Sequence, residues 1–372
     1  MKFVIDTISN SSLSRIGTLK NFHRLPQISF ETPILFMYSK GGCIPHLTHD
    51  VLQYVSKEYQ AIQVPLPSTI SCHHPLTKSQ EGIADFIGMR EYLVYCSVQD
   101  PAIPSPAGYN TMDKVSIWCK SGKEHVDSDR YMDIMEAFKP DIYQCLGDGE
   151  TNVDSTNKRI QKSIKRSLHM FHRCLERHKK SEALKNSAFI ALLQGGYDVE
   201  ERVNYAKEIA GSPIDGFVID GLHDNSPGVE FFDFDKVKPI VTESVKEFPE
   251  DKLRIVHGCW SPETVLKLVE LGIDAFDSSF PFAVTERGAA LTFPYKASDV
   301  CDADVNHKVP VTEDFVKEEH SYEINLGDSK YTEDFQPILK DCQCLCCKKH
   351  TRAYINHLLL SKELLARVLL MM

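Results

Sequence analysis

A polar stretch near the end of the 372-residue chain contains four thiols, those of Cys342, Cys344, Cys346 and Cys347. Two lysines follow directly, so apolar packing does not explain these thiols, and nearby positive charge stabilises thiolates. Thiolates on a tight loop can surround one tetrahedral ion, and Zn²⁺ is the usual ion of a site made mostly of sulfur. The stretch therefore predicts a structural metal site, with a redox-active or merely reduced cluster as the alternative. The fourth ligand stays open, because His350 and His357 lie nearby and Cys346 is a spare thiol.

A second group of side chains with binding chemistry is the basic segment Lys158–Arg177. The whole chain carries 42 Lys and Arg against 52 Asp and Glu, a net charge of −10. This balance argues against a general nucleic-acid binder, because nonspecific affinity comes mainly from neutralised phosphates, but it leaves room for a local patch. A solvated helix face is one interpretation. The sharper one is a contact with a nucleic-acid backbone through Lys162, Lys165 and Arg166.

Apolar runs of strand length recur along the chain with helical segments between them, which is the rhythm of a parallel sheet built from βαβ units. The nine runs are Ile34–Tyr38, Ala61–Pro65, Tyr92–Val98, Val115–Cys119, Ile142–Leu146, Ser187–Leu193, Gly216–Leu222, Leu253–Cys259 and Ala275–Phe280. Helices are expected at Tyr131–Phe138, Ser163–Leu175, Asp198–Ala210 and Phe234–Phe248, and after the N-cap Ser261. Nine runs are enough for a closed (β/α)8 barrel with one extra strand or hairpin. A doubly wound open sheet is the alternative, but no G-x-G-x-x-G follows an early run.

The sequence predicts three regions. Residues 1–295 hold the barrel, and residues 296–321 form an acidic, exposed insertion with little apolar content. Residues 322–372 hold the cysteine cluster and one amphipathic helix from about Thr351 to the end. The first residues lack a signal-peptide core, and no apolar stretch is long enough for a transmembrane helix. The other eight cysteines are therefore expected to be reduced thiols.

Several motifs resemble the tRNA-guanine transglycosylase family. The pattern C-x-C-x-x-C within Cys342–Cys347, followed by HTRAYINHL at His350–Leu358, resembles the zinc subdomain of that family. Further similar segments are Ile324–Leu326, Tyr331–Pro337, Gln194–Gly196, Asp220–Leu222 and Gly272–Asp277. Within the family, Pro45–His49 and Phe280–Gly288 are similar to the eukaryotic accessory subunit. The resemblance covers nearly the whole chain and implies a (β/α)8 TIM barrel with an inserted C-terminal zinc-binding subdomain.

The resemblance also implies a zinc ligand set. Cys342, Cys344 and Cys347 are the thiol ligands, and a histidine about 26 residues after Cys347 is the fourth, which falls just beyond Met372. The chain also ends on an apolar helix, Leu364–Met372, without a stop signal. We therefore expect a C-terminally truncated form that holds Zn²⁺ through three thiols and a substitute ligand, His350 or Cys346, or that holds it weakly.

For catalysis the resemblance implies base exchange, in which one Asp attacks the ribose carbon and expels guanine while a second Asp serves as general base. The nucleophile falls on Asp277, at the end of a predicted strand. Other parts depart from the family: Phe282-Ala283 replaces a Thr-Arg pair, Tyr95–Pro101 lacks a glycine pair, and Leu146–Asp148 replaces Phe-Asp-Glu. We expect a non-catalytic subunit that retains Asp277 as a hydrogen-bonded carboxylate. An active transglycosylase using Asp277 is the alternative, and a zinc-stabilised scaffold without tRNA contact is a third.

The expected partner is the catalytic queuine tRNA-ribosyltransferase subunit, in a heterodimer formed largely through the C-terminal helix. The complex would exchange guanine for queuine at the wobble position of GUN-anticodon tRNAs, with tRNA bound through the complex. The resemblance further implies a cytoplasmic protein with possible peripheral association at the mitochondrial outer membrane.

Overall fold

The computed structural model describes residues 1–222, 227–231, 233–258, 260–292 and 322–372. The predicted acidic insertion at 296–321, and its boundary at 295, lie outside these residues. Contacts divide the chain into two units. We call Met1–Ile44 with Glu58–Phe280 the barrel unit, and Pro45–Lys57 with Pro281–Met372 the C-terminal unit.

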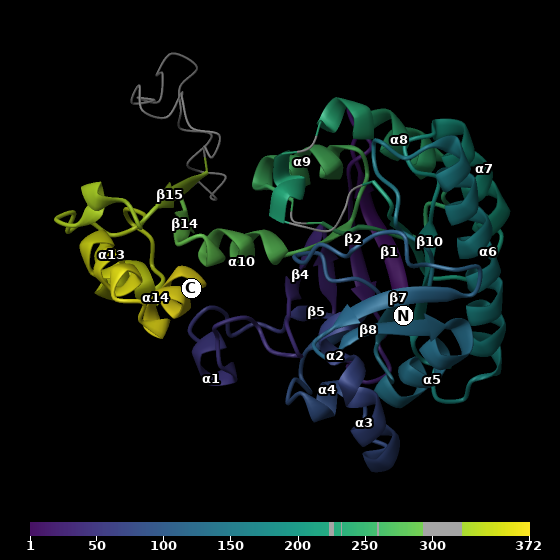
Figure 1. Cartoon of the computed structure of the whole chain (residues 1–372), viewed down its shortest axis with the longest axis horizontal. Helices are drawn as coiled ribbons and strands as arrows, with labels where there is room; N and C mark the ends of the chain where they lie inside the picture. Colours follow the sequence, from purple (N-terminus) through teal and green to yellow (C-terminus); the bar gives the residue numbers. More distant parts are fainter. Residues whose placement is uncertain (223–226, 232, 259, 293–321) are drawn as a thin grey trace. The chain divides into compact units, whose positions relative to one another are not determined.

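Eight parallel strands close into a barrel with helices around it (Figure 1), so the predicted (β/α)8 fold is confirmed. The strands, in their order around the barrel, are β4 (Ile34–Tyr38), β5 (Ala61–Pro65), β6 (Leu93–Ser97), β9 (Ile142–Gln144), β10 (Ala188–Leu193), β11 (Gly216–Ile219), β12 (Leu253–Val256) and β13 (Ala275–Asp277). β13 pairs with β4, which closes the ring. Strands covered on both faces read as continuous apolar runs, and all six residues of β10 are buried.

Helices follow the barrel strands as the βαβ rhythm requires. The longer ones are α5 (Ser128–Phe138), α6 (Asn157–Lys180), α7 (Val199–Ala210), α8 (Phe234–Lys246) and α9 (Pro262–Glu270). Short ones are α2 (Leu66–Thr69), α3 (His73–Ser79) and α4 (Ile83–Phe86), with 3-10 turns at Ile70–Cys72 and Pro227–Phe231. α9 begins as predicted, with the Ser261 hydroxyl accepting the N–H of Thr264. None of the helices within the described ranges is long and apolar enough to cross a bilayer.

Two antiparallel additions accompany the barrel. An N-terminal sheet of β1 (Lys2–Ile8), β2 (Arg15–Lys20) and β3 (Phe30–Thr32) was not predicted, because its strands carry mixed burial rather than apolar runs. Arg15 in β2 forms a buried ion pair of 2.6 Å with Asp274, which directly precedes β13, so this sheet is fixed to the barrel. The predicted run Val115–Cys119 lies in a hairpin of β7 (Lys114–Cys119) and β8 (Gly122–Asp127), not in the barrel.

The C-terminal unit contains α1 (His49–Leu52), α10 (from Ser279 to Glu286, across the boundary), the pair β14 (Ala289–Leu291) and β15 (Glu323–Asn325), α12 (Leu345–Lys349), α13 (Arg352–Leu360), α14 (Leu364–Leu370) and a 3-10 turn at Ser329–Tyr331. The prediction of one helix from Thr351 to the end is wrong. Lys362 adopts a left-handed φ of 59° and ends the path of α13. The break lets Ile355 of α13 and Leu369 of α14 share one small core.

Candidate functional sites

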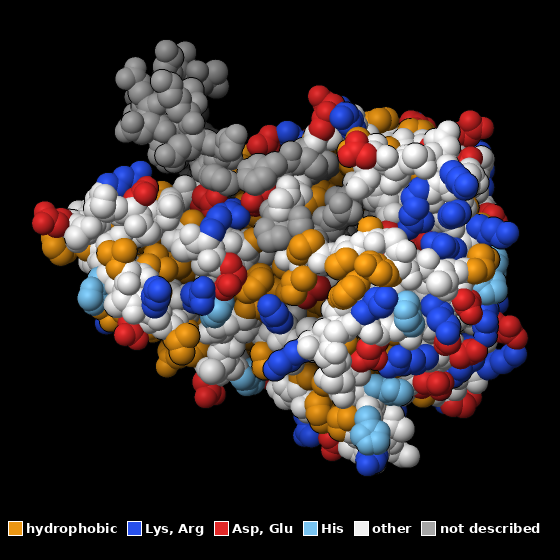
Figure 2. Space-filling model, in the orientation of Figure 1, with side chains coloured by type: hydrophobic (Ala, Val, Ile, Leu, Met, Phe, Trp, Pro, Cys, Tyr) orange, Lys and Arg blue, Asp and Glu red, His pale blue; other side chains and the backbone are white. Residues whose placement is uncertain are grey.

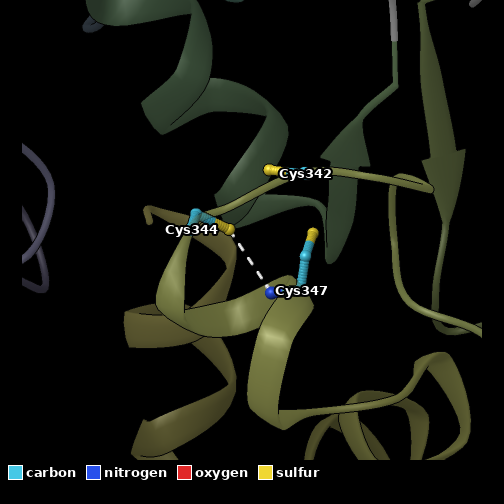
Figure 3. A group of neighbouring side chains, drawn as sticks. All are labelled: Cys342, Cys344 and Cys347. Carbon is cyan, nitrogen blue, oxygen red and sulfur yellow. Dashed lines mark hydrogen bonds between the residues drawn. The ribbon is translucent and has the colours of Figure 1, made fainter.

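Three cysteine sulfurs converge in the C-terminal unit (Figure 3). The Sγ atoms of Cys342, Cys344 and Cys347 all lie within 4.8 Å of one another. Cys344 is the N-cap of α12, and its sulfur accepts the N–H of Cys347 at 3.3 Å. This local cap explains the spacing, because one short helical turn brings the sulfurs of Cys344 and Cys347 to the same side. These are the three residues that the resemblance implied as thiol ligands.

The two substitute ligands considered from the sequence lie outside this group. Cys346 is 1% exposed and belongs to the core of the C-terminal unit, where burial raises the pKa of its thiol to about 12. The His350 ring stacks on Tyr354, with 5.3 Å between centroids. A cavity of about 320 Å³ opens beside the clustered sulfurs, and Leu369 to Met372 form part of its wall.

The donor set fits a metal ion. A tetrahedral zinc ion with Zn–S bonds of about 2.3 Å separates its sulfurs by roughly 3.8 Å, within the observed limit. Burial, and then the charges of Cys344 and Cys342, raise the pKa of Cys347 to about 12. Three neighbouring thiolates therefore need a cation to offset their repulsion. The cluster could bind a metal.

Asp277 ends β13 and is held by backbone and side-chain donors. The N–H of Gly258 donates to its Oδ2 at 2.7 Å, and the N–H and hydroxyl of Ser279 donate to Oδ1. Burial raises the pKa of Asp277 to about 6, although these hydrogen bonds act against the shift. The side chain lies at the carboxyl end of its strand, where barrel enzymes place catalytic groups.

A second buried carboxylate, Asp100, was not assigned a role from the sequence. It follows β6 and accepts hydrogen bonds from the Tyr38 hydroxyl at 2.9 Å and from the N–H of Ala102 at 3.0 Å. Burial raises the pKa of Asp100 to about 6, and its charge adds to the raised pKa of Asp277. The signal for it was an acid just after an apolar run, since parallel strands bring their carboxyl ends to one side.

Replacement of Asp277 with Asn should change how stability depends on pH. Its pKa of about 6 lies above the ordinary 3.8, so between these values the folded chain holds more protons than the unfolded chain. The free energy of unfolding therefore falls as pH rises through this window, by about 3 kcal/mol for this group. Asp277→Asn should gain stability relative to the native chain by that order, measured by urea unfolding on both sides of the window. A difference independent of pH would contradict the raised pKa.

Aromatic and polar side chains occupy the barrel interior near these carboxylates. Tyr95 of β6 is fully buried, and its hydroxyl donates to Gln144 Oε1 of β9 at 2.9 Å. The Tyr95 hydroxyl oxygen also lies 2.8 Å from Nε2 of His257, which follows β12. The Phe36 ring packs against Tyr95 with 5.1 Å between centroids. These hydrogen bonds connect β6, β9 and the residue after β12 across the barrel.

Asp148 is paired with two arginines of α6. Its side chain is fully buried; Arg159 Nη1 lies 3.0 Å and Arg166 Nη1 2.8 Å from Oδ2. Asn110 donates to Oδ1 at 3.0 Å. Burial opposes ionisation of Asp148, but these donors outweigh it and lower its pKa. Arg166, which the sequence analysis selected for RNA contact, is thus paired with a carboxylate.

The lysines in the first half of α6 have no such pairing. Lys158, Lys162 and Lys165 are exposed, and no salt bridge to an acidic residue is found for them within the described ranges. The arginines of the same helix, in contrast, pair with Asp148, Asp129 or Asp133. Figure 2 shows Lys and Arg side chains gathered on the side of the barrel unit where α6 and α7 lie.

The protein is a (β/α)8 barrel protein whose C-terminal unit brings three thiols together. The chain belongs to the queuine tRNA-ribosyltransferase family, whose model matches residues 10–372, so the predicted relationship is confirmed. A Gallus gallus relative named queuine tRNA-ribosyltransferase accessory subunit 2 is 40% identical over 375 residues, 96% of this chain and 87% of the relative. The Homo sapiens protein of that name is 39% identical over 389 residues, 100% of this chain and 92% of the relative. The Drosophila virilis protein of that name is 35% identical over 376 residues, 100% of this chain and 85% of the relative.

Proposed function

We propose that this chain is a non-catalytic accessory subunit of a queuine tRNA-ribosyltransferase complex that exchanges guanine for queuine at the wobble position of GUN-anticodon tRNAs. The observation that most directly supports this proposal is the pairing of Asp148 with Arg159 and Arg166. The resemblance places base recognition in the segment around Asp148, and this carboxylate is already neutralised and buried. The names of the relatives support the same role.

One observation favours the alternative of an active transglycosylase. Asp277 and Asp100 are two buried carboxylates whose charges influence each other, and base exchange requires a nucleophile and a general base. Hydrogen bonds from Gly258 and Ser279 already occupy both oxygens of Asp277, which fits a structural carboxylate at a strand end. We therefore rank the accessory role first.

The proposed partner is the catalytic subunit of the complex, in a heterodimer that the C-terminal helices help to form. The relatives' designation as accessory subunits supports a partner of this kind. The proposed RNA partner is tRNA, held through the complex and contacted by Lys162 and Lys165. Their ammonium groups are exposed and have no acidic partner in the part of the chain that the structure describes, which suits contact with phosphates. We also propose the cytoplasm, with peripheral association at the mitochondrial outer membrane, on the resemblance alone.

Zn²⁺ is the proposed metal, held by Cys342, Cys344 and Cys347 as a structural ion. The convergence of the sulfurs supports this assignment. His350 or Cys346 would need to move to complete the set, whereas the cavity lined by Leu369 to Met372 lies directly beside the sulfurs. A fourth ligand that reaches the ion from the side of this cavity fits the arrangement.

Labelled-guanine exchange tests the proposed function. The purified chain should show no exchange alone, while its complex with the catalytic subunit should be active. Asp277→Ala and Asp100→Ala in this chain should leave the exchange rate of the complex within about twofold, because neither carboxylate takes part. A complex whose catalytic subunit lacks its own nucleophile is the matched control and should be inactive. Exchange by this chain alone that disappears in Asp277→Ala would establish the alternative.

A further inference from the structure

The β7–β8 hairpin presents an aromatic and basic surface that the proposed function does not use. Tyr109, just before the hairpin, is 45% exposed, and its ring forms a T-shaped pair with the Trp118 ring, with 5.4 Å between centroids. The Lys123 ammonium lies 4.3 Å from the centre of the Tyr109 ring. Figure 2 shows hydrophobic side chains exposed in the region of this hairpin, with basic side chains beside them.

The pairing register of the hairpin separates its two faces. Trp118 pairs with Lys123, and Ser116 pairs with His125, so these four side chains share one face. The other face carries the fully buried Ile117 and Val126, which anchor the hairpin. Glu124, the acid of the hairpin's middle, pairs with Ile117 and points to that anchored side, where Arg130 binds it. Ser116 on this face is buried and Asp127 lies at its far end, so the accessible aromatic and basic side chains, Trp118 and Lys123, are at the turn end of the hairpin.

One buried carboxylate connects this hairpin to the lysines of α6. The Asn110 side chain accepts the N–H of Ser116 in β7 at 2.8 Å and donates to Asp148 at 3.0 Å. From α6, Arg166 binds the Asp148 carboxylate, and the N–H of Asp148 donates to the Ser167 hydroxyl at 2.9 Å. The hairpin and the exposed lysine face are thus held by the same residue.

We propose that the β7–β8 hairpin stacks an unpaired RNA base on Tyr109 while Lys162 and Lys165 of α6 bind neighbouring phosphates. This inference rests on the proposed RNA partner. Aromatic rings accept the face of any base, and proteins commonly combine such rings with basic side chains to hold single-stranded or loop RNA. The Lys123 ammonium, which lies over the Tyr109 ring, adds positive charge to this surface. Asp148 acts as a positioning residue that fixes the two parts of this surface.

Binding of two RNAs to the complex of this chain with the catalytic subunit tests the proposal: a stem–loop with an unpaired loop, and a fully paired duplex of equal length. Tyr109→Ala should weaken stem–loop binding by roughly 5- to 150-fold, the range for loss of one stacked base, with the salt dependence unchanged. Duplex binding should not change, because a paired base cannot stack on the ring. Tyr109→Phe keeps the ring and should bind both RNAs within about twofold of the native chain.

The variant Lys162→Ala/Lys165→Ala distinguishes the stacking proposal from the proposed RNA partner on which it rests. It should weaken the binding of both RNAs and flatten the salt dependence of binding. If Tyr109→Ala binds the stem–loop with the affinity of the native chain while the lysine variant binds it more weakly, the stacking proposal is overturned and the proposed RNA partner is retained. No measurable binding of either RNA by the complex that contains the unaltered chain would overturn both. Unchanged thermal unfolding of each variant confirms that the fold is intact.

Discussion

Cys347→Ser is expected to remove the bound zinc and to destabilise the C-terminal unit. A serine hydroxyl does not replace a thiolate ligand, and among the described residues three thiols converge on the proposed ion. Structural zinc contributes up to about 10–16 kcal/mol in small zinc domains, which sets an upper bound here because the unit also has its own core. Metal content after gel filtration should fall from one zinc per chain to near zero. The melting transition of the C-terminal unit should shift down or disappear.

Cys346→Ala and His350→Ala are the matched controls for this prediction. Cys346 is a neighbouring thiol in the core, so its loss should cost packing of about 1 kcal/mol or more but leave the zinc content unchanged. His350 stacks on Tyr354 and should also be dispensable for the metal. Loss of zinc in either control would instead identify that residue as the fourth ligand. Full zinc content in Cys347→Ser would contradict the proposed ligand set.

The barrel could be predicted because its strands are covered on both faces. Largely apolar runs such as Ala61–Pro65 and Ser187–Leu193 coincide with β5 and β10, in which every residue is buried. β1 and β2 escaped prediction because they expose many side chains and depend on the distant ion pair of Arg15 with Asp274. The break between α13 and α14 was also missed, because its left-handed position is occupied by Lys362 and not by a Gly or Asn that would have indicated it.

The candidate sites likewise include one that the sequence predicted and others that only the structure shows. The metal cluster was visible because Cys342, Cys344 and Cys347 are close in sequence, and one helical turn is enough to join them. Asp100 and Asp148 needed the tertiary structure, since the partners that define them come from other segments. Arg166 is the clearest case. A basic helix indicates positive charge, but only the fold shows that this guanidinium faces Asp148 while the lysines beside it face solvent.

The exposed lysines of α6 are therefore the side chains expected to bind phosphate. Lys162→Glu/Lys165→Glu is expected to weaken tRNA binding by the complex by roughly 10- to 100-fold near physiological salt. Each lost phosphate contact should reduce the slope of log affinity against log salt by about 0.9, so the slope should fall by about 2. Fluorescence anisotropy with labelled tRNA over a salt series measures both quantities. The fold should be unaffected, because both side chains are exposed and no acidic partner is found for them among the described residues.

The control is Lys179→Glu/Lys180→Glu, which makes the same charge change at the far end of α6, where both lysines are also exposed. If long-range charge alone governed binding, the two double variants would weaken tRNA equally, which would contradict a local contact. Arg166→Gln provides the opposite signature. It removes one of two guanidinium partners from a buried carboxylate, so it should lower the unfolding temperature, and any loss of tRNA affinity should leave the salt slope almost unchanged. A surface that binds phosphate loses slope, whereas a positioning pair loses stability, and these two measurements assign each side chain of α6 to one role.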